Sequence, residues 1–100
     1  MGFDLNDVWP FDQPRDCAVL TLRQVLDGTE PILLVSHDLD DDGWQFIGSS
    51  DASMEDARVV SLEEMVDLDL AILEVADLRP GWQAVRKRPG LAWKRRRRPT

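Results

Sequence analysis

Several residue types are scarce in this 100-residue chain, which has one cysteine, one histidine and no tyrosine. The lone Cys17 cannot close an internal disulfide or pair with a second thiol at a metal site. No apolar run reaches the ~18 to 20 residues of a membrane span, and the first residues lack the basic and apolar regions of a signal peptide. We therefore expect a cytoplasmic protein that does not enter a membrane and is stabilised by packing.

Motifs of the common enzyme classes are also missing: the sequence contains no G-x-S-x-G, G-x-G-x-x-G, P-loop or H-E-x-x-H pattern. A dyad of Cys17 and His37 stays open, although a lone cysteine before an apolar run is usually a small buried hydrophobe. Ser36, His37 and Asp38 are the residue types of a hydrolase triad, but neighbours in a strand point to opposite faces. We expect a protein that is not an enzyme and needs no cofactor.

Charge is divided between two parts of the chain. Residues 1–81 hold four basic and 19 acidic side chains, a formal charge of −15, whereas residues 82–100 hold eight basic side chains and no acidic one. An acidic surface steers basic partners and raises their rate of encounter. The pattern favours a protein partner of unknown identity.

Composition predicts one core: 43% of the residues are hydrophobic, and they include four tryptophans and three phenylalanines. We expect Trp44, Trp82 and Trp93 to be largely buried, and Trp9 to differ from them. The predicted fold class is α+β, with a small antiparallel sheet built from hairpins and packed against two or three short helices. Its predicted parts are an irregular N-terminal arm (1–16), a single domain (17–93) and a basic disordered tail (94–100).

Two hairpins are expected. Residues 32–35 and 44–47 are apolar and flank an Asp-Asp-Asp-Gly turn, in which the Asp42-Gly43 step suits a tight reversal. Residues 82–85 and 91–93 flank a basic loop in the same way. Further short strands are predicted at 18–20 and 58–60.

Three helical segments are expected from capping signals. Thr21 can cap a turn over 22–26 that stops at Asp27-Gly28, and Ser61 with Glu64 forms a capping box for a helix over 62–66. Asp67 or Asp69 then caps a third helix, which is apolar over more than one face and ends at Pro80-Gly81. We expect this third helix to be central.

Acidic residues around the first hairpin turn are the first candidate site. Asp38, Asp40 and Asp42, followed by Gly43, match the opening half of a calcium loop, but Ser49 stands where such a loop needs a bidentate glutamate. We therefore predict an acidic surface turn and keep the three aspartates as weak metal candidates. The residues predicted to contact a protein partner are Asp40, Asp41, Asp42, Trp9 and Arg86.

Consecutive cations near the C-terminus are the second candidate site: Lys94, Arg95, Arg96, Arg97 and Arg98. Clustered cations displace counterions from a phosphate backbone, and Trp82 and Trp93 would offer stacking faces nearby. Against this stands the −15 of residues 1–81, so we do not expect nucleic acid to be the partner. A nucleic-acid or nucleoprotein accessory factor is the alternative function, and an enzyme that uses His37 or aspartates is the third.

Motifs across residues 31–94 resemble those of small bacterial proteins of unknown function related to immunity proteins of contact-dependent toxin systems. The segments that carry the resemblance are 42–46 (DGWQF), 60–62 (VSL), 67–69 (DLD), 78–82 (LRPGW) and 86–93, from Arg86 to Trp93. The resemblance implies an α+β fold and a protein partner, and it brings no catalytic residues with it. The chain departs from the pattern in its arm, in its arginine tail, and at Asp69-Leu70, where Asp-Pro is usual.

Overall fold

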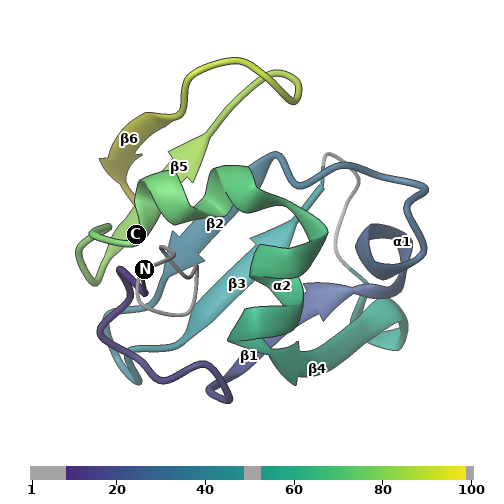
Figure 1. Cartoon of the computed structure of the whole chain (residues 1–100), viewed down its shortest axis with the longest axis horizontal. Helices are drawn as coiled ribbons and strands as arrows, with labels where there is room; N and C mark the ends of the chain where they lie inside the picture. Colours follow the sequence, from purple (N-terminus) through teal and green to yellow (C-terminus); the bar gives the residue numbers. More distant parts are fainter. Residues whose placement is uncertain (1–8, 49–52, 99–100) are drawn as a thin grey trace, which may run out of the picture.

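The chain folds into one mixed sheet with short helices (Figure 1). The computed structural model describes residues 9–48 and 53–98. Its strands are β1 (Ala18–Leu22), β2 (Leu34–His37), β3 (Trp44–Ile47), β4 (Ala57–Ser61), β5 (Trp82–Val85) and β6 (Lys94–Arg97). Its helices are α1 (Arg23–Leu26), α2 (Leu62–Leu68) and the 3₁₀ segments η2 (Met54–Asp56) and η3 (Leu70–Val75). The predicted α+β class is confirmed.

Strand order in the sheet is β4-β1-β3-β2-β5-β6. The first predicted hairpin forms, because β2 pairs antiparallel with β3. In the second, β5 pairs antiparallel with residues 94–97 of β6 and not with the predicted 91–93. The sheet departs from the predicted antiparallel arrangement at one place, since β1 and β3 are parallel. The β2–β3 hairpin inserts with β3 next to β1, and the buried Thr21 hydroxyl donates to the Phe46 carbonyl at 2.7 Å across this pair. Local hairpin signals could not show this long-range pairing.

One face of the sheet is covered by α2 and η3, which Figure 1 shows crossing in front of the strands. The buried core includes Trp44, Phe46, Ile32, Leu62, Met65 and Ile72. Trp44 is buried as predicted, whereas Trp82 and Trp93 are only partly buried and pack against the core. Among the residues described, no helix has the length and apolar character needed to cross a membrane.

The first two helices follow their capping signals unequally. Ser61 caps α2 as predicted, because its Oγ accepts a hydrogen bond from the Glu64 N–H at 3.2 Å. Thr21 does not cap α1: it belongs to β1, and Leu22 stands at the N-cap without a side-chain bond. The sheet pairing of Thr21 therefore overrides its capping preference.

A short 3₁₀ segment, η3, replaces the long central helix that we expected before Pro80. Asp69 has extended backbone (φ −151°), which separates η3 from α2, and its Oδ1 accepts from the Ala71 N–H at 3.0 Å. Ile72 is buried while Leu70 is 60% exposed. The segment thus buries one face only.

The prediction of a disordered tail is wrong for residues 94–98. Residues 94–97 form β6, and the strand expected at 91–93 lies in the connection before it. The arm, in contrast, docks where the structure describes it: Phe11 is 5% exposed and belongs to the core. The rest of the predicted arm (1–8), the end of the predicted tail (99–100) and Ser49 lie outside the described residues.

Candidate functional site

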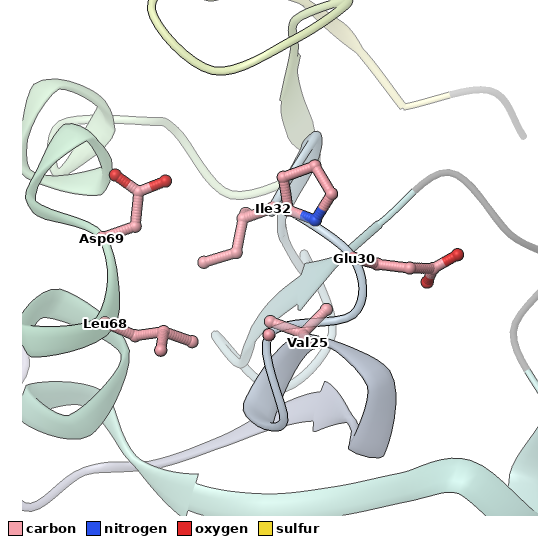
Figure 2. A pocket seen from close by; sticks show the side chains of 7 residues that line it. Val25, Glu30, Ile32, Leu68 and Asp69 are labelled. Carbon is pink, nitrogen blue, oxygen red and sulfur yellow. The ribbon is translucent and has the colours of Figure 1, made fainter.

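A groove lies between α1 and the junction of α2 with η3. It has a volume of about 280 Å³ and is lined by Val25, Gly28, Glu30, Pro31, Ile32, Leu68 and Asp69. We call it the α1–α2 groove. Figure 2 shows Leu68 and Asp69, which form the wall of the groove, opposite Val25 and Ile32, which form its floor. The Leu68 and Ile32 side chains extend into the space between them.

Local signals in the sequence build the apolar floor of this groove. Val25 and Ile32 are 1% and 2% exposed. Gly28 has φ +82° just after α1, a left-handed conformation that glycine adopts without a Cβ clash and that commonly ends helices. The chain therefore turns sharply between the two floor residues.

Arg86 holds the wall and the floor of the groove together. Its Nε donates to the Ile32 carbonyl at 3.0 Å, and its Nη2 donates to Asp69 Oδ2 at 2.5 Å. The guanidinium also lies 4.3 Å from the centre of the Trp93 ring, whose Nε1 donates to the Ala71 carbonyl at 3.1 Å. A buried charge needs such partners to offset its desolvation. The groove is consequently fixed in shape by one arginine.

This position corrects the prediction that Arg86 contacts a partner. Its side chain is 1% exposed, and its hydrogen bonds are made within the chain. The sequence places Arg86 in a basic loop, which predicts a surface residue. Only the fold shows that its side chain is buried against Asp69. Arg86 is therefore a positioning residue for the groove.

Exposed leucines adjoin the groove, and sequence reasoning did not select them. Leu68 is 45% exposed and Leu70 is 60% exposed, on either side of Asp69. These exposed apolar side chains enlarge the apolar surface beside the buried floor of the groove. The sequence does indicate that Leu68 is exposed, because Leu68 falls outside the inward-facing stripe of Leu62, Met65 and Val66 on α2.

The acidic turn places its three predicted contact residues differently. Asp40 and Asp41 are exposed, and Asp41 Oδ1 accepts from the Gly43 N–H at 2.9 Å. Asp42 has φ +59°, which aspartate tolerates in tight turns, and its Oδ1 lies 2.7 Å from His37 Nε2. All three aspartates are thus exposed, and Asp42, whose side chain is 61% exposed, is also bonded to His37.

Asp38 is also hydrogen-bonded within the chain, which weakens the prediction that Asp38, Asp40 and Asp42 bind a metal ion. Its carboxylate accepts from Gln45 Nε2 at 2.8 Å and from Arg98 Nη1. Among residues 9–48 and 53–98, no three His, Cys, Asp or Glu side chains form a group that could hold a metal ion. The turn is organised by hydrogen bonds and an arginine.

His37 is bonded at both ring nitrogens. Nδ1 lies 2.6 Å from the Leu78 carbonyl, which only accepts, so Nδ1 donates there. Nε2 faces Asp42, and the ring stacks on Trp44 with centroids 4.0 Å apart. Cys17 Sγ instead lies 3.6 Å from the Ala18 carbonyl. The dyad of Cys17 and His37 is therefore not formed, and His37 fastens the turn to the segment after η3.

Trp9 meets the acidic turn through Gln13. Its Nε1 donates to the Gln13 carbonyl at 2.6 Å, and Gln13 Nε2 donates to Asp42 Oδ2 at 3.1 Å. The Arg15 guanidinium lies 4.5 Å from the centre of the Trp9 ring. Trp9 and Asp42, both predicted to contact a partner, are thus linked through Gln13. Their main role is to hold the N-terminal arm against the acidic turn.

The arginines among the consecutive cations at 94–98 have partners within the chain. Arg95 donates to Asp77 Oδ1 at 2.6 Å and Arg96 Nε donates to Gln83 Oε1 at 2.6 Å, while Arg98 pairs with Asp38. The hydrogen bond from Arg95 holds the pKa of Asp77 below its ordinary value. Arg97 lies 6.0 Å from the centre of the Trp82 ring. An arginine therefore lies over each of the two rings proposed for base stacking, Trp82 and Trp93.

Comparisons of the chain with protein-family models, with curated proteins and with solved structures give no match. The resemblance to immunity proteins stays a prediction from the sequence, as does the protein partner that it implies.

Proposed function

We propose that this chain is a non-enzymatic protein-binding module that uses the α1–α2 groove on its acidic body. The observation that carries the proposal is the groove itself: a buried apolar floor, a half-exposed leucine on its wall, and a buried arginine that fixes its shape. Such an arrangement is pre-organised, so little ordering cost accompanies binding. The resemblance to immunity proteins, which also implies a protein partner, agrees with this choice.

Groove size favours a side chain of a partner over a free small molecule. Sites for drug-sized ligands usually occupy ~300–1,000 Å³, and the groove, at about 280 Å³, lies at or below that range. An aliphatic side chain that enters it would contact Val25, Ile32 and Leu68. The groove thus fits an apolar anchor on a protein surface.

Charge around the groove indicates what flanks that anchor. Asp67 is exposed next to Leu68, and residues 1–81 carry −15 in total. A complementary partner carries lysine or arginine beside its aliphatic residue, because opposite charges steer the encounter and select the orientation. We therefore propose a basic partner segment with a leucine-like anchor.

A basic peptide that alternates leucine and lysine is a suitable probe. Isothermal titration calorimetry should detect its binding, and replacing its leucines by serine should weaken the affinity at least roughly tenfold, because the apolar anchor is lost. Leu68→Asp in the protein should cause a similar loss. Leu39→Asp is the matched control, since Leu39 is 72% exposed on the β2–β3 turn and does not line the groove.

Two outcomes would contradict the proposal. Equal binding of the serine peptide would show attraction by charge alone, and an equal loss in Leu39→Asp and Leu68→Asp would show that the groove has no special part. Circular dichroism should confirm that both variants keep the fold.

A further inference from the structure

We propose a second binding surface: the outer edge of β6 binds an acidic, extended peptide segment of a partner by adding it as a further strand. β6 ends the sheet order and all four of its residues, Lys94–Arg97, are exposed. The proposal is independent of the α1–α2 groove, because it concerns another surface and the opposite partner charge.

Backbone geometry identifies the groups that would pair. The Arg98 N–H donates to the Gly81 carbonyl on the β5 side at 2.8 Å. Main-chain groups in an antiparallel ladder face the two sides of a strand alternately, so those of Lys94 and Arg96 also face β5. Those of Arg95 and Arg97 face outward. An added strand would therefore exchange its hydrogen bonds with these two residues.

Side chains of β6 supply complementary charge on both faces of that edge. Arg95 and Arg97 turn to the face of Asp77 and Trp82, where they have partners. Alternation puts Lys94 and Arg96 on the other face, beside Gln83. Carboxylates on alternate positions of an added strand would lie close to these cations, and opposite charges across strands are favourable.

A basin adjoins the start of β6. It has a volume of about 490 Å³ and is lined by Val85, Arg86, Lys87, Leu91, Ala92 and Lys94. Its apolar residues suit an aliphatic side chain, and Lys87 and Lys94 suit carboxylates beside it. The preferred segment therefore mixes acidic and aliphatic residues.

Two other occupants fit less well. A second copy that paired β6 with β6 would bring two rows of cations together, an arrangement by which proteins prevent edge pairing. Nucleic acid matches the cations but not the alternating N–H and C=O groups, and the −15 of residues 1–81 repels a long polyanion. A short acidic peptide matches both the charge and the backbone.

A labelled peptide of alternating glutamate and valine tests this, with fluorescence anisotropy for affinity and amide hydrogen exchange of the full chain for position. The expected result is binding that slows exchange at the Arg95 and Arg97 amides. Two forms of the peptide, N-methylated on one or the other set of alternate residues, keep the charge. One form should bind roughly tenfold more weakly than the other, because only one set of N–H groups faces β6.

Protein variants separate the strand edge from general charge. Lys94→Glu with Arg96→Glu should weaken the peptide at least roughly tenfold, whereas Arg58→Glu with Lys94 and Arg96 intact should have little effect. Arg58 is the matched control because it lies on β4, the opposite edge of the sheet. Lys94→Gln with Arg96→Gln, a milder change, should give an intermediate loss if the charge-reversed chain fails to fold.

Several results would overturn the proposal. Unchanged exchange at the Arg95 and Arg97 amides, or equal affinity of the two N-methylated peptides, would exclude strand addition. Tighter binding of a duplex oligonucleotide that displaces the peptide would assign the edge to nucleic acid. Loss of peptide binding in Leu68→Asp, with the β6 variants unaffected, would place the peptide at the groove.

Discussion

Arg86 and Asp69 form an ion pair beneath the surface, with Nη2 and Oδ2 2.5 Å apart and with side chains that are 1% and 27% exposed. The two residues come from the loop after β5 and from the junction of α2 with η3. Asp69 also caps η3 through its other oxygen. The ion pair therefore joins the helical layer to the loop after β5. The bond from Arg86 Nε to the Ile32 carbonyl extends this link to the segment that enters β2, and together the two contacts shape the α1–α2 groove.

Replacing Arg86 by methionine should destabilise the fold strongly. Removing one partner of a buried pair costs about 3 to 5 kcal/mol, and the partial exposure of Asp69 places this variant near the lower end. Urea denaturation measures the loss in free energy of unfolding. Arg88→Met, at an exposed position in the same loop, should change it by less than about 0.5 kcal/mol. Equal effects would show that the pair has no special role.

His37→Ala should also destabilise the chain, by about 2 to 4 kcal/mol, because it removes two hydrogen bonds and leaves a cavity against Trp44. The amide resonances of Asp42 and Leu78 should shift together, since His37 bonds to both residues. Asp41→Ala, in the same turn but with only a local bond to the Gly43 N–H, serves as the control. A change in stability as small as that of the control would refute the fastening role of His37.

Asp77 should titrate at a lower pH than a free aspartate, because Arg95 donates a hydrogen bond to it and lowers its pKa. Since the folded pKa lies below the unfolded value, the interaction stabilises the fold above the unfolded pKa. That contribution is lost as the pH falls through the folded pKa. Carboxyl NMR should show Arg95→Gln returning the pKa of Asp77 toward its ordinary value.

Asp27 provides an internal control in the same titration. Its pKa is lowered chiefly by the Thr29 hydroxyl and then by the Thr29 N–H. Arg95→Gln should leave the Asp27 pKa unchanged, whereas Thr29→Ala should raise it. A shift of both aspartates in Arg95→Gln would point to a general charge effect instead of the hydrogen bond to Asp77.

Deleting residues 94–100 should destabilise the sheet, because β5 loses its antiparallel neighbour and the pairs with Asp77 and Asp38 disappear. The loss of several ladder bonds predicts a cost of about 2 to 4 kcal/mol. The deletion changes the net charge from −7 to −12. Hydrogen exchange should quicken at the β5 amides. If the deletion left hydrogen exchange at the β5 amides and the stability unchanged, residues 94–100 would behave as a disordered tail and not as a strand of the sheet.

Elements with local signals were predictable from the sequence. The turn at Asp42-Gly43 and the cap at Ser61 needed only neighbouring residues, and both are present. The parallel pairing of β1 with β3, the burial of Arg86 and the order of the basic run depend on partners far along the chain. Arg98 meets Asp38 across 60 positions, and no local pattern encodes that contact. The acidic turn was found as a surface feature, but the groove required the fold.

Isotope-filtered NOE spectroscopy of the basic leucine peptide bound to the labelled chain tests the central claim, that the α1–α2 groove receives an aliphatic anchor. We predict NOEs from the peptide leucine methyls to the methyls of Val25, Ile32 and Leu68. NOEs to Leu39, or to none of these methyls while the peptide is bound, would contradict it.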